Sequence, residues 1–165
     1  MKLMTMAVIA GAFASVATAG SANANLSVSA SIADNCLITT TSVSFGAYDA
    51  ISANASTALN GTGAVKVTCT KNAAATVKLG QGANAGGSST DAAPVRQMSD
   101  GSSNVMSYQL YSDSGRTSVW NNDTGVSHTG TGSEVTLTVY GKVPAGQNTL
   151  PAGSYNDTVQ ATVTF

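Results

Sequence analysis

Alternation of apolar and polar residues runs through most of the chain and constrains its fold more than any other feature. It appears in seven stretches, whose apolar members are Leu26, Val28, Ala30 and Ile32; Val43 and Phe45; Val65, Val67 and Cys69; Val77 and Leu79; Met106, Tyr108 and Leu110; Val135, Leu137 and Val139; and Val159, Ala161, Val163 and Phe165. Successive side chains of a strand point to opposite faces of a sheet. Each stretch therefore predicts a β-strand with one apolar row.

The segments between these stretches are rich in turn-forming residues. Pro, Asp, Asn and Gly gather at residues 100–101, 113–115, 122–125, 144–146 and 151–153. Gly, Asn and Asp accept positive φ, and Pro presets φ for a turn. Residues 80–93 are rich in Gly, Ala, Ser and Asn and predict a long surface loop. Short strands with frequent turns and no sustained helical pattern indicate an all-β sandwich or barrel.

The N-terminus has the features of a secretory signal peptide. Lys2 is followed by an uncharged apolar stretch over residues 3–16 and then by small residues that end in Ala22-Asn23-Ala24. This order predicts a signal peptide over residues 1–24 and cleavage after Ala24, and cleavage after Ala19 is the alternative. A membrane anchor is a second reading, but the apolar stretch is shorter than the roughly 20 residues that span a bilayer.

Charged residues are scarce. They make up 9% of the 165 residues, and the formal net charge is −1. A typical soluble domain contains about 25% charged residues. A surface of Ser, Thr, Asn and Ala suits a protein that packs into an assembly better than one that stays monomeric at high concentration. Since the chain has no basic run, we expect no nucleic-acid partner.

Two cysteines, Cys36 and Cys69, follow the predicted signal peptide. An even number of cysteines in a small exported domain favours a disulfide. A metal pair or a reactive thiol is the alternative, but the chain has no C-x-x-C motif and His128 is its only histidine. Metal sites need more ligands than this sequence brings together, so we expect no metal and no cofactor.

The sequence offers no catalytic centre. His128 lies in a polar segment without a second histidine, and no G-x-S-x-G motif is present. The acidic residues Asp91, Asp100, Asp113 and Asp123 lie in predicted turns, which explains them without acid or base chemistry. We therefore predict that the protein is not an enzyme. Sugar binding by Tyr108, Tyr111, Trp120 and Tyr140 is a further hypothesis, but these rings belong mostly to core-like strands.

The pattern predicts an alternating strand over residues 25–33, ahead of the first cysteine. The pattern alone does not show which strand it pairs with. It is either the first strand of the chain's own sheet or a strand donated to another molecule. An extended peptide can add to an exposed sheet edge, with main-chain hydrogen bonds for affinity and side-chain pockets for specificity. Burial of Leu26, Val28 and Ile32 would contribute about 5–9 kcal/mol before costs.

Four sequence pieces in order resemble the spore coat protein U domain family, which includes subunits of archaic (Csu-type) chaperone–usher pili. They are Cys36-Leu37-Ile38 with Val43-Ser44-Phe45-Gly46-Ala47-Tyr48; Val65-Lys66-Val67-Thr68-Cys69-Thr70; residues 106–113 running on to Val119-Trp120; and residues 140–144 with 152–158 and the final strand. One departure is Asn121, where the family often has glycine after the tryptophan.

This resemblance implies an incomplete immunoglobulin-like β-sandwich, over residues 34–165, that is completed by donor-strand exchange. The donor residues would be Leu26, Val28, Ala30 and Ile32, within a donor strand over residues 25–33. Val159, Ala161, Val163 and Phe165 would line the acceptor groove and face the chaperone, although they are equally suited to be core residues. Cys36 and Cys69 would correspond to the family's disulfide.

The function that the resemblance implies is that of a structural pilus or fimbria subunit supporting adhesion and biofilm formation. Its partners would be a periplasmic chaperone, an outer-membrane usher and neighbouring subunits, and it would be secreted through the periplasm to the cell surface. One domain with a donor-like N-terminus favours a repeating or adapter subunit over a tip subunit. The alternative is a secreted spore or cell-surface coat protein of the same fold.

Overall fold

The computed structural model describes residues 17–165 and divides after Ser31 into two units. Residues 17–35 belong to no helix or strand. The apolar stretch 3–16 of the predicted signal peptide lies outside the described residues. Among residues 17–165, no helix is long and apolar enough to cross a membrane.

The unit that begins at Ile32 is nearly all β, as the alternation predicts. Its strands are β1 (Cys36–Ser44), β2 (Leu59–Cys69), β3 (Ala74–Leu79), β4 (Arg96–Ser99), β5 (Val105–Tyr111), β6 (Val126–Thr129), β7 (Glu134–Val143) and β8 (Ala161–Thr164). One short helix, α1 (Ala53–Ser56), interrupts them. The prediction of a loop over residues 80–93 is confirmed, because no strand lies between β3 and β4.

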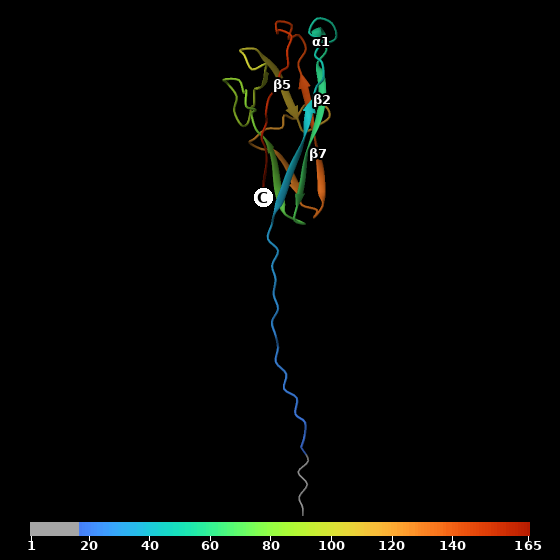
Figure 1. The fold of residues 1–165 in the computed structure, drawn as a ribbon, viewed down its shortest axis with the longest axis vertical. Coiled ribbons are helices and arrows are strands. Elements are labelled where there is room, and N and C mark those ends of the chain that lie inside the picture. Colours follow the sequence, from blue (N-terminus) through green and yellow to red (C-terminus); the bar gives the residue numbers. More distant parts are fainter. Residues whose placement is uncertain (1–16) are drawn as a thin grey trace, which may run out of the picture. The chain divides into compact units, whose positions relative to one another are not determined.

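The strands form two antiparallel sheets. The larger sheet has the order β1-β2-β7-β5-β4, and the smaller has the order β6-β3-β8. Figure 1 shows β2 and β7 side by side, in agreement with their long ladder from Leu59↔Val143 to Thr68↔Glu134. This is an immunoglobulin-like sandwich, in which β1 is an edge strand of one sheet and β8 is an edge strand of the other.

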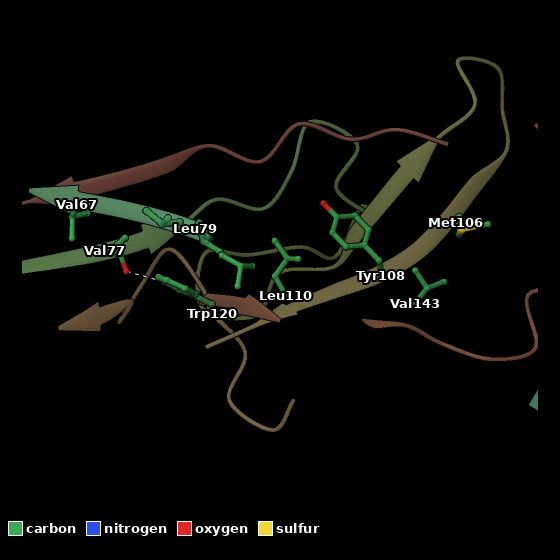
Figure 2. Packing of buried hydrophobic residues seen from close by; sticks show 10 residues of the cluster. Val67, Val77, Leu79, Met106, Tyr108, Leu110, Trp120 and Val143 are labelled. Carbon is green, nitrogen blue, oxygen red and sulfur yellow. Dashed lines mark hydrogen bonds between the residues drawn. The ribbon is translucent and has the colours of Figure 1, made fainter. Parts of the chain in front are cut away.

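The core contains the apolar rows that the alternation predicts. Its buried members are Val65, Val67, Val77, Leu79, Met106, Tyr108, Leu110, Trp120, Val139 and Val143. Figure 2 shows side chains of β2, β3, β5 and β7 within this core. Two apolar rows pack against each other and leave the polar rows outside, which is the arrangement that stabilises a sandwich.

Trp120 joins the two sheets. Its backbone N–H donates to Leu110 O on β5 (3.0 Å), and its indole Nε1–H donates to Val77 O on β3 (2.8 Å), as Figure 2 shows. The side chain is 2% exposed. Arg96 makes a second connection, because its buried guanidinium donates to carbonyl oxygens of Gly80 and Trp120. Burial lowers the pKa of Arg96 to about 10.

Three details of the strands differ from the sequence predictions. β4 and β6 were not predicted, because four residues each are too few for a clear alternation. β1 starts at Cys36, seven residues before the predicted Val43, and an irregularity between Thr41 and Ser44 interrupts its pairing with β2. The final strand is shorter than predicted, since β8 begins at Ala161.

Candidate functional site

A cleft opens between β1 and the segment that leads into β8, and we call it the edge cleft. It consists of two adjoining cavities of about 450 and 780 Å³. They share five lining residues, Val43, Phe45, Met98, Tyr155 and Asn156. Both strands beside the cleft are sheet edges, so their outward main-chain groups lack a strand partner within residues 17–165. Such edges are templates for pairing with another chain.

Each wall of the smaller cavity comes from a different sheet edge. Residues 40–43 of β1 form one wall, and residues 155–159 with Ala161 form the other. Buried core residues also contribute to its lining, among them Val65, Leu79, Leu110 and Val139. Each of these residues occupies an inward position of its strand and lies at the floor of the cleft, where it is at most 5% exposed. The arrangement can accept the apolar face of one extended segment.

The larger cavity continues past the end of β1. Residues 43–48 and 150–156 line it, and Met98, Met106 and Val143 add apolar side chains. Among the residues that line the two cavities, Asp157 alone carries a charged side chain. The cleft therefore suits an occupant without charged side chains, whose apolar side chains can meet the apolar part of the lining.

Paired glycines allow Phe45 to lie at the boundary of both cavities. Gly61 on β2 is paired with Gly141 on β7. A Cβ atom added to Gly141 would lie 2.6 Å from Cζ of Phe45, and one added to Gly61 would lie 2.9 Å from Cδ1 of the same ring. The missing side chains thus leave room for the ring, which also packs edge-on against Tyr108 with 6.2 Å between ring centroids.

Asp157 fixes the wall of the cleft that leads into β8. Its Oδ2 accepts a hydrogen bond from the Tyr108 hydroxyl (2.6 Å), and its Oδ1 accepts from the backbone N–H and the side-chain amide of Asn84 (3.1 Å each). Asn156 adds a backbone bridge to Ser99 on β4. Burial, followed by the hydrogen bond to Asp157, raises the pKa of Tyr108.

We expect Tyr108→Phe to lower the free energy of unfolding by about 1–3 kcal/mol, because it removes one buried hydrogen bond to Asp157. Above about pH 10 an unfolded tyrosine loses its proton. Tyr108 keeps its proton in the fold, so folding binds a proton there and the wild type loses stability as the pH rises further. Tyr108→Phe has no hydroxyl to titrate at this position, so this part of the loss of stability at high pH is absent in the variant.

Chemical denaturation from pH 7 to 11 measures both effects. Tyr111→Phe is the control, because the Tyr111 hydroxyl forms no hydrogen bond with any described residue. Equal stability of Tyr108→Phe and Tyr111→Phe at pH 7 would contradict the role given to the Asp157 contact.

The structure places the predicted groove residues in two groups. Val159 and Ala161 line the edge cleft. Val163 and Phe165 do not line either cavity; Val163 packs near the disulfide, and Phe165 follows the end of β8 and is 56% exposed. Ala161 and Val163 lie on the same strand, so the cleft ends within β8, between the pairs Leu79↔Ala161 and Val77↔Val163.

The predicted donor residues are exposed. Leu26 is 89% exposed, Val28 87% and Ile32 89%. Burial of these large apolar side chains against a partner surface would lower the free energy, so their exposure indicates an interaction site. Cys36 and Cys69 form a disulfide that joins the paired ends of β1 and β2, shortly after this segment.

Sequence reasoning did not identify most residues of the cleft. Phe45, Val65, Leu79, Leu110 and Val139 were predicted as ordinary inward residues. Whether an inward residue faces a neighbouring strand or a cleft depends on strand order, and alternation carries no information on strand order. The one usable signal was glycine at two strand positions, Gly61 and Gly141, since glycine in a strand often marks the close approach of another group.

Comparisons with known proteins agree on one family. The model of the Spore Coat Protein U domain matches residues 22–162. Protein U of Myxococcus xanthus is 41% identical over 160 residues, which cover 92% of this chain and 89% of that protein. The family match begins before β1, extends into β8 and includes every residue that lines the edge cleft.

A solved structure has a similar fold. It is the crystal structure of the CsuC–CsuE chaperone–tip adhesion subunit pre-assembly complex from archaic chaperone–usher Csu pili of Acinetobacter baumannii, and one of its chains is similar with a TM-score of 0.57. The identity is 21%, and the match covers 81% of this chain and 40% of that chain. This chain therefore spans less than half of the length of that protein, and the likeness concerns the fold.

Proposed function

Because this chain belongs to the spore coat protein U domain family, we propose that it is a structural subunit of a surface pilus that assembles by donor-strand complementation. Each subunit presents its edge cleft to the residues 25–33 of a neighbouring subunit. The single observation that carries the proposal is the edge cleft, with an apolar lining between two unpartnered sheet edges.

The proposed donor matches the cleft in chemistry. Residues 25–33 contain no charge and place Leu26, Val28, Ala30 and Ile32 on one face of an extended strand. Serines occupy the opposite face, which would remain near solvent. The main chain of the donor pairs with the free edges, and its apolar face covers the lining of the cleft. Val159 and Ala161 contact the donor from the wall next to β8.

The proposed partners follow from the same cleft. An exposed apolar cleft beside free edges is an aggregation hazard before assembly, so a periplasmic chaperone occupies it first. The similar Acinetobacter structure is itself a complex of a chaperone with a pilus subunit, which supports this step. At an outer-membrane usher, the N-terminal strand of the next subunit then replaces the chaperone in the cleft. The route begins with export by residues 1–24 and ends in a fibre that supports adhesion and biofilm formation. In this proposal the protein has a structural and not a catalytic role.

Electron microscopy of the source organism with and without this gene tests the proposal. We expect thin surface fibres on the parent cells, their absence on the deletion strain and their return when the gene is restored. Antibody labelling along the fibres identifies a repeating subunit. Fibres that persist unchanged and unlabelled in the deletion strain would contradict the proposal.

A coat protein of the same fold is a second candidate, and the 41% identity with Protein U together with the spore-coat name of the family favours it. The same experiment separates the two. A coat protein would label a continuous surface layer, and its deletion would thin that layer without any change in fibres.

A further inference from the structure

Residues 26–32 also have the pattern and the length to enter the edge cleft of their own molecule. If residues 33–35 formed a three-residue hairpin loop, Ile32 would pair with Cys36, Ala30 with Ile38 and Val28 with Thr40. A loop of three residues is common in β-hairpins, and the segment Ala33-Asp34-Asn35 contains the turn formers Asp and Asn. Such a hairpin would occupy the free edge of β1.

The faces of the strands also match in this register. Cys36 and Ile38 are half-buried positions of β1, and Thr40 lines the edge cleft. Directly paired residues of an antiparallel ladder share a face of the sheet. The apolar row that begins at Ile32 would thus point into the molecule's own cleft. A subunit closed in this way would be neither donor nor acceptor.

The structure holds residues 33–35 in a different path. The Thr70 hydroxyl accepts a hydrogen bond from the Asn35 N–H (3.1 Å), and its one proton can be donated to the carbonyl oxygen of Asn35 (3.3 Å) or of Ala33 (3.4 Å). The Thr70 backbone N–H donates to Asn35 O (2.9 Å). Asn35 therefore continues the line of β1 alongside β2, one residue beyond the pair Cys36↔Cys69.

These contacts exclude the hairpin loop. A loop over residues 33–35 would turn Asn35 toward the free side of β1, away from Thr70 on the side of β2. The disulfide between Cys36 and Cys69 fixes the next residue and prevents the turn from shifting into β1. We propose that Thr70 is a positioning residue that holds residues 33–35 extended and so keeps residues 26–32 out of their own cleft, available to a neighbour. This inference rests on the proposed function, since it concerns the same donor and cleft.

Four forms of the protein test the role of Thr70: the wild type, Thr70→Val, Thr70→Ser and Thr68→Val. Each is expressed from the full sequence in a bacterial host, purified from the periplasmic fraction and separated into monomer and oligomer. Thr70→Val removes the hydroxyl at nearly constant volume, and Thr70→Ser retains it. Thr68→Val is the matched control two residues earlier on β2, because the Thr68 hydroxyl forms no hydrogen bond with a described residue.

We expect Thr70→Val to raise the ratio of monomer to oligomer about five-fold, as the loss of one to two hydrogen bonds implies. Amide exchange of residues 26–32 in the monomer should be slow in this variant and fast in the other three forms. A general loss of stability would not slow exchange in this segment. Equal ratios and fast exchange in all four forms would overturn the proposal for Thr70.

If Thr70→Val does not fold, a second variant tests the same inference. Insertion of Gly-Ser-Gly-Ser between Ala33 and Asp34 supplies a flexible loop, so the segment can fold back while Thr70 remains. We expect slow exchange of residues 26–32 in its monomer, and fast exchange would overturn the inference. A wild type that never forms oligomers would contradict the proposed function instead, and exchange in the monomers would still decide the role of Thr70.

Discussion

Replacement of Leu26, Val28 and Ile32 by serine is expected to abolish assembly while the folded domain keeps its stability. Each apolar side chain gains about 1.5–3 kcal/mol when it is buried in the cleft of a neighbour, so the triple variant loses about 5–9 kcal/mol, which is comparable with the binding free energy of a micromolar contact. In the unassembled chain these residues are almost fully exposed, so their replacement removes no contact within the core.

Size-exclusion chromatography with light scattering measures the assembly, and the fluorescence of Trp120 measures folding. Trp120 is the only tryptophan and is buried, so its emission reports on the intact sandwich. The control replaces Ser27, Ser29 and Ser31 by threonine, on the opposite face of the same segment. We expect this control to assemble like the wild type. Assembly by the triple serine variant would show that residues 26–32 are not the donor.

The second large effect is expected from Val159→Arg, which places a charged side chain in the edge cleft. Val159 lines the smaller cavity from the segment that leads into β8. A donor strand would bury this charge, and Asp157, the one carboxylate of the lining, already accepts hydrogen bonds from Tyr108 and Asn84. Burial of the charge would therefore cost several kcal/mol, and we expect the affinity for a donor to fall at least about a hundred-fold. The variant should remain monomeric at concentrations at which the wild type forms oligomers.

The neighbouring residue supplies the control for Val159→Arg. Gln160 is exposed and does not line either cavity, so Gln160→Arg introduces the same charge on the outside of the same segment. We expect Gln160→Arg to assemble normally. A thermal unfolding curve of each variant confirms that the domain is folded. Equal loss of assembly in both variants would indicate a general effect of the added charge and would contradict the role of the cleft.

The sequence predicted the elements of the fold better than the site. Apolar alternation identified the core rows of β2, β3, β5 and β7, because burial of one face imposes a period of two on a strand. The family resemblance, which the comparisons confirm, added the immunoglobulin-like arrangement of those strands. Alternation alone does not distinguish this arrangement from a barrel.

The lining of the edge cleft could not be predicted from the pattern. Val139 on β7 has the same local signature as any inward residue, and it lines the cleft only because no strand lies between β1 and the segment before β8. The family resemblance implies a groove position for Val163 as well as for Val159, because both belong to the apolar row of the final strand. The cleft ends within β8, between Ala161 and Val163, and the apolar row carries no information on this boundary.

The polar contacts between distant residues could not be predicted from the sequence either. The hydrogen bonds of Asp157 with Tyr108 and Asn84 join residues separated by 49 and 73 positions. The contacts of Thr70 with Ala33 and Asn35 span 37 and 35 positions. Both pairs of contacts arise from the order of strands in the sheets, so they become visible only when that order is known.

The most direct test of the account is to mix the triple serine variant with Val159→Arg and to measure the mass of the product by light scattering. The first variant has an intact cleft and no donor, and the second has an intact donor and a blocked cleft. We expect each variant alone to be a monomer and the mixture to form a heterodimer of one copy of each. A mixture that remains monomeric, while both variants are folded, would contradict completion of one subunit by the N-terminal strand of another.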